Sequence, residues 1–226
     1  MRKFLLSAML ISAGRFLYAQ ADTVFIQREY VDDVYHAIYI DDHKDSKYYG
    51  YIADFTFSDW DSASYRESLV SLKGIRKRSI SKTLPRQWCE LRAYKGKYYL
   101  YAPSDWGNNS RLIISDTTLI EFNMDGAYAS RIDSIGSPAL NTWELRLTAF
   151  DNFRTKLRIH MIDAEKRLAV FESDADEYTG PGYYRLMVAA DHIRNFPIIV
   201  NYCREMKQLE YEFEKIDFEQ LLGRKP

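Results

Sequence analysis

Apolar and polar residues alternate along most of this chain. In residues 143–149 every second position is apolar, from Trp143 through Leu145 and Leu147 to Ala149, and the positions between are polar. A period of two is typical of a strand with one face on a core and the other in water. Similar patterns predict strands at 23–30, 34–41, 48–57, 119–124, 127–132, 156–162, 167–171 and 183–189.

Turn signals separate these strands. Lys95-Gly96 divides residues 86–102 into a hairpin, and Asp125-Gly126 is a stronger signal because a tight two-residue turn requires positive φ. A third hairpin is expected to turn at 163–166, and Gly180-Pro181-Gly182 predicts a loop. About ten strands at such short spacing favour an antiparallel barrel or sandwich.

Two segments depart from the period of two. Residues 61–72 carry Tyr65, Leu69 and Leu72 at helical spacing, which predicts a short helix. Near the C-terminus the alternation of apolar residues with glutamates over 209–214 is typical of a strand. The same region also contains a helical stripe, spaced by four and three: Tyr202, Met206, Leu209, Phe213 and Ile216. We favour a helix that packs this stripe on the outside of the β structure.

The predicted fold class is therefore all-β, mainly an antiparallel barrel or sandwich, with a C-terminal helix. The architecture is similar to that of lipocalin-like barrels. This is an analogy of architecture alone, because no sequence motif carries it.

The first 21 residues predict export. Arg2 and Lys3 precede a short apolar run, and Ala19-Gln20-Ala21 forms a small-x-small cleavage site, which together is the pattern of a signal peptide. The run is too short to span a bilayer, and Arg15 interrupts its extension. We expect residues 22–226 to form a single β-rich domain in the periplasm or outside the cell, with no transmembrane segment.

Charge and cysteine content limit the classes of partner. Removing residues 1–21 takes away three basic residues and no acid, so the net charge of −1 becomes −4, which argues against nucleic acid. The one basic cluster, residues 73–82, is either a solvated loop or a contact for an anionic surface. Export permits disulfides, and Cys89 and Cys203 could form a single bridge; Cys89 could equally be a small buried hydrophobe.

Motifs of known catalytic chemistry are absent. The chain has no Gly-x-Ser-x-Gly elbow, His-Glu-x-x-His, phosphate-binding glycine loop or Cys-x-x-Cys, so we predict no cofactor and lean against an enzyme. His36 is expected to be a hydrogen-bonded core histidine and His160 a solvated one. The cluster 41–45 has metal-like composition but is better explained as a solvated turn, so we predict no metal site.

Two loops repeat the sequence Ser-Asp-Trp, at residues 58–60 and 104–106. An exposed indole beside Asp and Asn side chains can stack on a sugar ring while the polar groups bind its hydroxyls. The alternative is that each Trp covers the end of the core while Asp and Ser cap a turn. The predicted ligand-binding residues are Asp59, Trp60, Asp105, Trp106, Asn108 and Asn109.

These features lead to three hypotheses of function. The first is a β-barrel binding domain whose mouth holds a small apolar ligand or a glycan. The second is an envelope module that binds another protein and no ligand, and the third is a carbohydrate-active hydrolase. A deep cavity lined by Tyr and Trp would favour the first. A filled core with an exposed aromatic patch would favour the second hypothesis, the protein-binding module. Two carboxylates that face each other across a cleft would favour the third, the hydrolase.

Overall fold

The computed structural model describes residues 23–105, 109–174, 182–205 and 209–224. The predicted signal peptide lies outside these residues. The strands are β1 (Val24–Val31), β2 (Val34–Asp41), β3 (Gln87–Tyr94), β4 (Lys97–Ala102), β5 (Arg111–Ile114), β6 (Thr118–Asn123), β7 (Gly126–Ala139), β8 (Thr142–Thr148), β9 (Arg154–Asp163), β10 (Leu168–Ser173), β11 (Tyr183–Ala189) and β12 (Ile198–Cys203). The helices are α1 (Tyr48–Ile52), α2 (Asp59–Ser71), the 3₁₀ helix η2 (Ala190–Asn195) and α3 (Phe218–Leu221).

Eight of the strands close into a barrel. The consecutive strands β5 to β11 form an antiparallel meander, and β3 joins its two ends. One edge of β3 pairs with β11, and the first half of its other edge pairs with β5, where Gln87 lies opposite Ile113. The prediction of a mainly antiparallel barrel is confirmed.

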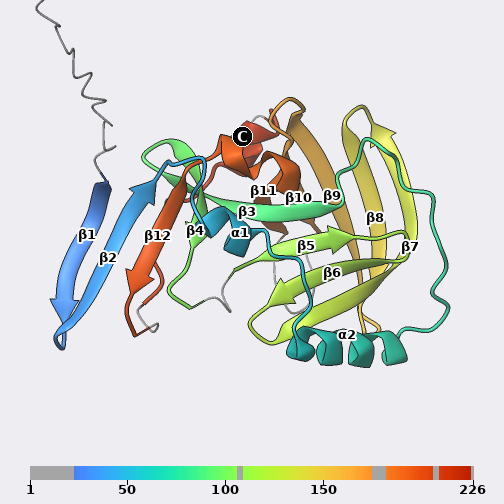
Figure 1. Ribbon diagram of the computed structural model, residues 1–226. Helices are drawn as coiled ribbons and strands as arrows, with labels where there is room; N and C mark the ends of the chain where they lie inside the picture. Colours follow the sequence, from blue (N-terminus) through green and yellow to red (C-terminus); the bar gives the residue numbers. More distant parts are fainter. Residues whose placement is uncertain (1–22, 106–108, 175–181, 206–208, 225–226) are drawn as a thin grey trace, which may run out of the picture.

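The remaining strands extend from the barrel as an open sheet. The second half of β3 leaves β5 and pairs with β4, with Leu91 opposite Leu100. Beyond β4 the order is β12, β2 and β1, and only the β4–β12 pairing is parallel. Figure 1 shows this extension at the left and the barrel at the right. Among the helices in the described ranges, none combines the length and apolar character needed to cross a membrane.

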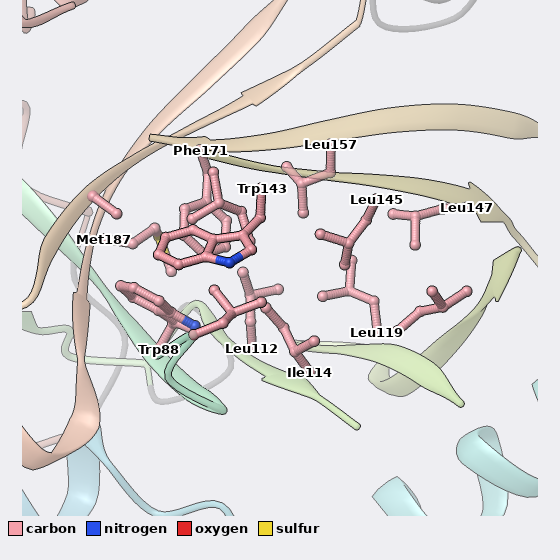
Figure 2. Close-up of a cluster of buried hydrophobic side chains, with 14 of the residues drawn as sticks. Trp88, Leu112, Ile114, Leu119, Trp143, Leu145, Leu147, Leu157, Phe171 and Met187 are labelled. Carbon is pink, nitrogen blue, oxygen red and sulfur yellow. The ribbon is translucent and has the colours of Figure 1, made fainter. Parts of the chain in front are cut away.

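Apolar side chains fill the barrel interior. Trp88 is fully buried, and its ring meets Phe171 in an edge-on contact with centroids 5.0 Å apart. Figure 2 shows these rings with Trp143, Met187 and surrounding leucines. Leu84, from the loop between α2 and β3, belongs to the same cluster. The alternation of the strands supplies these residues, so the lumen is a core rather than a deep ligand cavity.

A second core lies on the outer face of β10, β11, β3 and β4. It contains Val170, Val188 and Leu100 from these strands, covered by Tyr49 and Ile52 of α1 and by residues of η2. The C-terminal segment adds its own apolar residues to this layer, including Phe218 and Leu221 of α3. The barrel wall here is therefore buried on both faces.

Most of the predicted strands and turns are confirmed, but two segments differ. Residues 48–57 were expected to form a strand, whereas 48–52 are α1 and place Tyr49 and Ile52 on one buried side. The C-terminal helix is only α3, and the predicted stripe from Tyr202 to Ile216 is not helical where it is described. Tyr211 and Phe213 instead lie in an extended segment that forms a bridge between Glu214 and Ala93.

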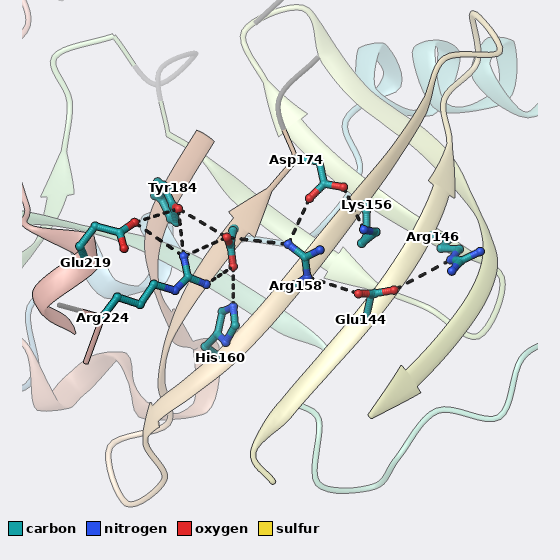
Figure 3. A network of polar contacts seen from close by, with 10 residues as sticks. Glu144, Arg146, Lys156, Arg158, His160, Asp174, Tyr184, Glu219 and Arg224 are labelled. Atoms are coloured by element: carbon teal, nitrogen blue, oxygen red, sulfur yellow. Dashed lines mark hydrogen bonds and ion pairs between the residues drawn. The ribbon is translucent and has the colours of Figure 1, made fainter. Parts of the chain in front are cut away.

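An ion network on the outer face holds the C-terminal end in place. Glu172 of β10 accepts from Arg224 at 2.8 Å and lies 2.8 Å from His160 of β9. Arg158 extends the network to Asp174 at 3.1 Å and to Glu144 at 3.3 Å (Figure 3). His160 is on the outer face, as expected, but it is paired with a carboxylate rather than simply solvated.

Both cysteines are free and buried. Cys89 lies in the middle of β3, where its thiol is 3.6 Å from the carbonyl oxygen of Ile52, and burial raises its pKa to about 12. Cys203 lies at the end of β12. The structure therefore has no bridge between them, and Cys89 is the small buried hydrophobe that the sequence offered as the alternative.

Candidate functional site

The mouth of the barrel is shaped by helix α2, which replaces a strand. Pairing between β7 and β8 reaches only as far as Arg131 and Thr148, so residues 126–130 of β7 have no partner strand on that side. The hydroxyl of Ser64 accepts from the backbone N–H of Ala127 at 3.2 Å, and that of Ser68 accepts from Ala129 at 3.0 Å. Two helix serines thus satisfy a strand edge that would otherwise be open.

This close approach depends on Gly126. Its φ of +114° is in a region that side chains disfavour, and a Cβ there would lie 2.1 Å from the Ser64 hydroxyl oxygen. The predicted turn is confirmed, but it lies one residue earlier than expected. Asn123 pairs with Gly126, so the two residues of the turn are Met124 and Asp125. The glycine therefore serves the docking of α2 as well as the turn.

A pocket of about 530 Å³ opens beside α2 at this end of the barrel. Tyr128 and Phe150 stack on one another in its wall, with ring centroids 5.4 Å apart and planes 30° apart. Apart from Ala149, the rest of the lining carries carboxylate, amide and hydroxyl groups: Glu67, Glu121, Asp125, Asn123, Ser68, Ser71 and Ser130. We call this the mouth pocket. Its combination of ring faces with hydrogen-bonding groups suits a polar ligand that has apolar faces.

An ion pair across the barrel fixes the inner part of the mouth pocket. Arg185 of β11 donates to Glu121 of β6 at 2.7 Å, and the Arg185 side chain is only 10% exposed. Burial disfavours the charge on Arg185, but the nearby Glu121 carboxylate outweighs it and raises the pKa of the guanidinium. Glu121 is therefore held in one position, with its carboxylate still partly open to the pocket.

The first Ser-Asp-Trp loop lies next to this pocket. Ser58 caps α2 and forms a reciprocal pair with Asp61, so the loop begins a helix rather than ending a strand. Asp59 is exposed in the first turn. Trp60 is 67% exposed, and its indole N–H donates to the Asp125 carbonyl oxygen at 2.9 Å. Tyr128 also donates to that oxygen, so the turn joins Trp60 to the mouth pocket.

The second Ser-Asp-Trp loop has a different role. Asn109 is 6% exposed, and its side-chain amide donates to the carbonyl oxygens of Tyr51 and Ile52 at 3.3 and 3.2 Å. These contacts attach the loop to the end of α1, which makes Asn109 structural. Asp105 is exposed, and the predicted residues Trp106 and Asn108 lie outside the described part of the chain. Within the described residues, Ser104 and Asp105 do not begin a helix as Ser58 and Asp59 do.

A second hollow, of about 630 Å³, lies between the C-terminal segment and β3. It is also aromatic, but its polar groups are already used in holding that segment. The Tyr101 hydroxyl accepts from Asn201 at 2.9 Å and from the N–H of Tyr211 at 3.2 Å, and it donates to Glu210. Asn201 in turn accepts from His36, which is 4% exposed and is the hydrogen-bonded core histidine that the sequence predicts. We therefore assign this hollow to structure.

The expected turn at 41–45 is held by its own hydrogen bonds. Asp41 accepts from His43 at 2.8 Å and from Ser46 at 2.6 Å. In the chain as described, no three metal-ligating side chains come close enough to form a metal site.

Sequence reasoning located Trp60 but missed the stacked pair of the mouth pocket. Phe150 is 44% exposed in the turn after β8, and Tyr128 follows the Asp125-Gly126 turn. An exposed aromatic residue in a turn was the available signal for Phe150. Comparison with known proteins gives no relative: no family model, no curated protein and no solved structure matches this chain.

Proposed function

We propose that this protein is a glycan-binding domain whose ligand occupies the mouth pocket. The observation that carries the proposal is the stacked pair Tyr128 and Phe150 beside carboxylate, amide and hydroxyl groups in a pocket of about 530 Å³. A sugar ring presents an apolar face, which can pack on an aromatic ring, and a rim of hydroxyls, which bind carboxylates and amides. The signal peptide predicted from the sequence fits a periplasmic or secreted protein that meets such ligands.

The filled lumen favours this form of the binding hypothesis over an apolar ligand in the barrel. Trp88, Phe171 and Leu145 occupy the space that a buried lipid would need. The mouth pocket is partly polar and open, and Glu121 in its wall is engaged by Arg185. An apolar ligand would displace water from the polar groups of this lining without replacing its hydrogen bonds, which costs free energy, whereas the hydroxyls of a sugar can replace them.

The test is a screen of purified residues 22–226 against neutral oligosaccharides, followed by calorimetry on each binder. Replacing Phe150 with Ala removes one of the two stacked rings, and we expect the affinity to fall by at least about tenfold. Leu140→Ala is the matched control, because Leu140 is 91% exposed in the turn between β7 and β8. An absence of binding to any glycan, or equal binding by the Phe150→Ala variant, would refute the proposal.

A protein partner is the second candidate, and one observation favours it. Among the described strands, β1 is the outermost of the open sheet, and Val24, Phe25 and Tyr30 are 57%, 43% and 73% exposed on it. An edge strand with exposed aromatic residues can accept a strand from a partner. A photo-reactive residue in place of Phe25 should then form a single specific adduct in the envelope, and the same residue in place of Leu140 should not.

A further inference from the structure

Four cationic side chains gather on the outer face of β7, β8 and β9, around a groove of about 660 Å³. They are Arg131 of β7, Arg146 of β8, and Arg154 and Lys156 of β9. The antiparallel register explains this. Thr148 lies opposite both Arg131 and Arg154, and Arg146 lies directly opposite Lys156. We call this the cationic groove, and Figure 3 shows Arg146 and Lys156 on neighbouring strands.

Two carboxylates in the groove neutralise only part of its charge. Asp133 lies 2.6 Å from Arg131 and accepts from Thr148 at 2.5 Å. Burial would raise the pKa of Asp133, but these hydrogen bonds outweigh it and lower that pKa. Asp174 pairs with Lys156 at 3.1 Å. Four cations and two anions leave the lining with an excess of two positive charges.

The excess lies on two arginines that face the solvent. Arg146 is 69% exposed, and its nearest carboxylate, Glu144, is 3.9 Å away and is also shared with Arg158. Arg154 is exposed and makes no ion pair within 4.0 Å with any described residue. Both guanidinium groups are therefore available to a ligand.

The register also places like charges against each other. Arg146 and Lys156 are directly opposite on an antiparallel pair, an arrangement of like charges that destabilises a sheet relative to a neutral pair. A bound anion would remove this repulsion. Local conflicts of this kind are expected where a surface serves a function.

The loop that carries the basic cluster runs beside the cationic groove. Arg131 donates to the backbone carbonyl oxygen of Lys73, and Arg78 donates to that of Ile132 at 3.2 Å. Arg76 and Lys77 are exposed on this loop. The basic cluster and the groove are therefore parts of one positive surface, and the groove is its recessed part.

We propose that the cationic groove binds a phosphate group. Guanidinium groups donate two parallel hydrogen bonds to oxyanions, and a phosphate dianion matches the excess of two positive charges. A single carboxylate would neutralise only half of that excess. The phosphate is a monoester, which can carry two negative charges, and it belongs either to a free phosphorylated molecule or to a lipid headgroup that ends in a phosphomonoester. The chemistry at the groove is the same for both sources.

Two arms of one experiment separate these sources. In the first, inorganic phosphate and pyrophosphate are titrated into residues 22–226 at low salt, and binding is measured by calorimetry and by NMR shifts. In the second, the protein is sedimented with vesicles of phosphatidic acid and phosphatidylcholine, or of phosphatidylcholine alone. Binding in the first arm indicates a soluble phosphorylated ligand, and binding in the second arm alone indicates a lipid headgroup.

The decisive variant is Arg146→Gln/Arg154→Gln. It removes two exposed charges, so the fold should be retained, and we expect the affinity in the responsive arm to fall at least about tenfold. The matched control is Lys97→Gln/Lys166→Gln, which removes two exposed charges at the β3–β4 and β9–β10 turns. Its affinity should stay within about twofold of the unmodified protein. Absence of binding in both arms, or equal weakening by the two double variants, would overturn the proposal.

Discussion

Glu172 is predicted to stabilise the fold more than any other carboxylate of the ion network. Its side chain is 11% exposed and is contacted by Arg224, His160 and, at 3.8 Å, Arg158. Burial acts to raise its pKa, but the hydrogen bonds from Arg224 and His160 outweigh burial and lower the pKa from 4.5 to about 2. This difference corresponds to about 3 kcal/mol of folding free energy, since each pKa unit is worth about 1.4 kcal/mol.

The perturbation is Glu172→Gln, which keeps the shape of the side chain and removes its charge. At pH 7 we expect the free energy of unfolding to fall by about 3 kcal/mol, or the melting temperature by about 6–12 °C for a domain of this size. Urea unfolding followed by circular dichroism measures the first quantity, and calorimetry measures the second.

The pH dependence has a definite sign. Because the folded pKa lies below the unfolded one, the contribution of Glu172 is complete above pH 4.5 and disappears as the pH falls towards 2. At pH 3 about 1.4 kcal/mol should remain. The difference between the unmodified protein and the Glu172→Gln variant should therefore shrink by more than half between pH 7 and pH 3.

Glu219→Gln is the matched control. Glu219 is 50% exposed and lies 3.6 Å from Arg224, so its loss should cost no more than about 0.5 kcal/mol. If the two variants lose equal stability, or if the deficit of Glu172→Gln is the same at pH 7 and pH 3, the reasoning from the lowered pKa is wrong.

Two further predictions concern backbone packing and the thiols. Gly126→Ala should lower the free energy of unfolding by at least about 2 kcal/mol, because the added Cβ strains φ and displaces Ser64 from β7. Gly136→Ala is the control: no atom lies within 4 Å of its added Cβ, so it should cost less than about 0.5 kcal/mol. Equal losses of stability in urea unfolding would contradict this account. Cys89 and Cys203 should both be inert to Ellman's reagent in the native protein and should both react in guanidinium without reductant. An intact mass lower by two hydrogens would show instead that they are bridged.

The strands were predictable because their signals are local. Alternation fixes which face of a strand is apolar, and the Lys95-Gly96 turn has the positive φ values, 48° and 69°, that a tight hairpin requires. The same reasoning failed at residues 48–57. A strand was predicted there, but the buried residues Tyr49 and Ile52 are three apart, which is the spacing of a helix.

The C-terminal segment shows the opposite error. A stripe at helical spacing was preferred over an alternation at strand spacing, although the segment satisfied both. Tertiary contacts decided between them. Tyr211 and Phe213 pack with Tyr101 in an extended segment, and Glu214 accepts from the backbone N–H of Lys95 at 2.9 Å. Helix propensity is a weak predictor of secondary structure here, because an extended chain can pair with a sheet edge and also pack into an aromatic cluster.

The candidate site was harder to predict, because it depends on the residue at which the pairing between β7 and β8 ends. The sequence left open whether Trp60 is exposed or covers the end of the core. It is exposed and lies next to the pocket, whose lining comes from α2, β6, β7, the turn between β6 and β7, and the turn after β8. They meet because β8 ends at Thr148 and α2 takes the place of a strand along β7. No periodicity in the sequence specifies that point.

The strand alternation that builds the core also separates the two proposed sites. Ser130 and Arg131 are consecutive on β7, so they point to opposite sides of the barrel wall; Ser130 lines the mouth pocket and Arg131 lines the cationic groove. One lining carries carboxylates and the other carries an excess of positive charge, so a single ligand group could not satisfy both. Loss of glycan binding by Phe150→Ala and loss of phosphate binding by Arg146→Gln/Arg154→Gln should therefore be independent. If each variant weakened both activities, the two surfaces would have to be parts of one site coupled through β7 and β8.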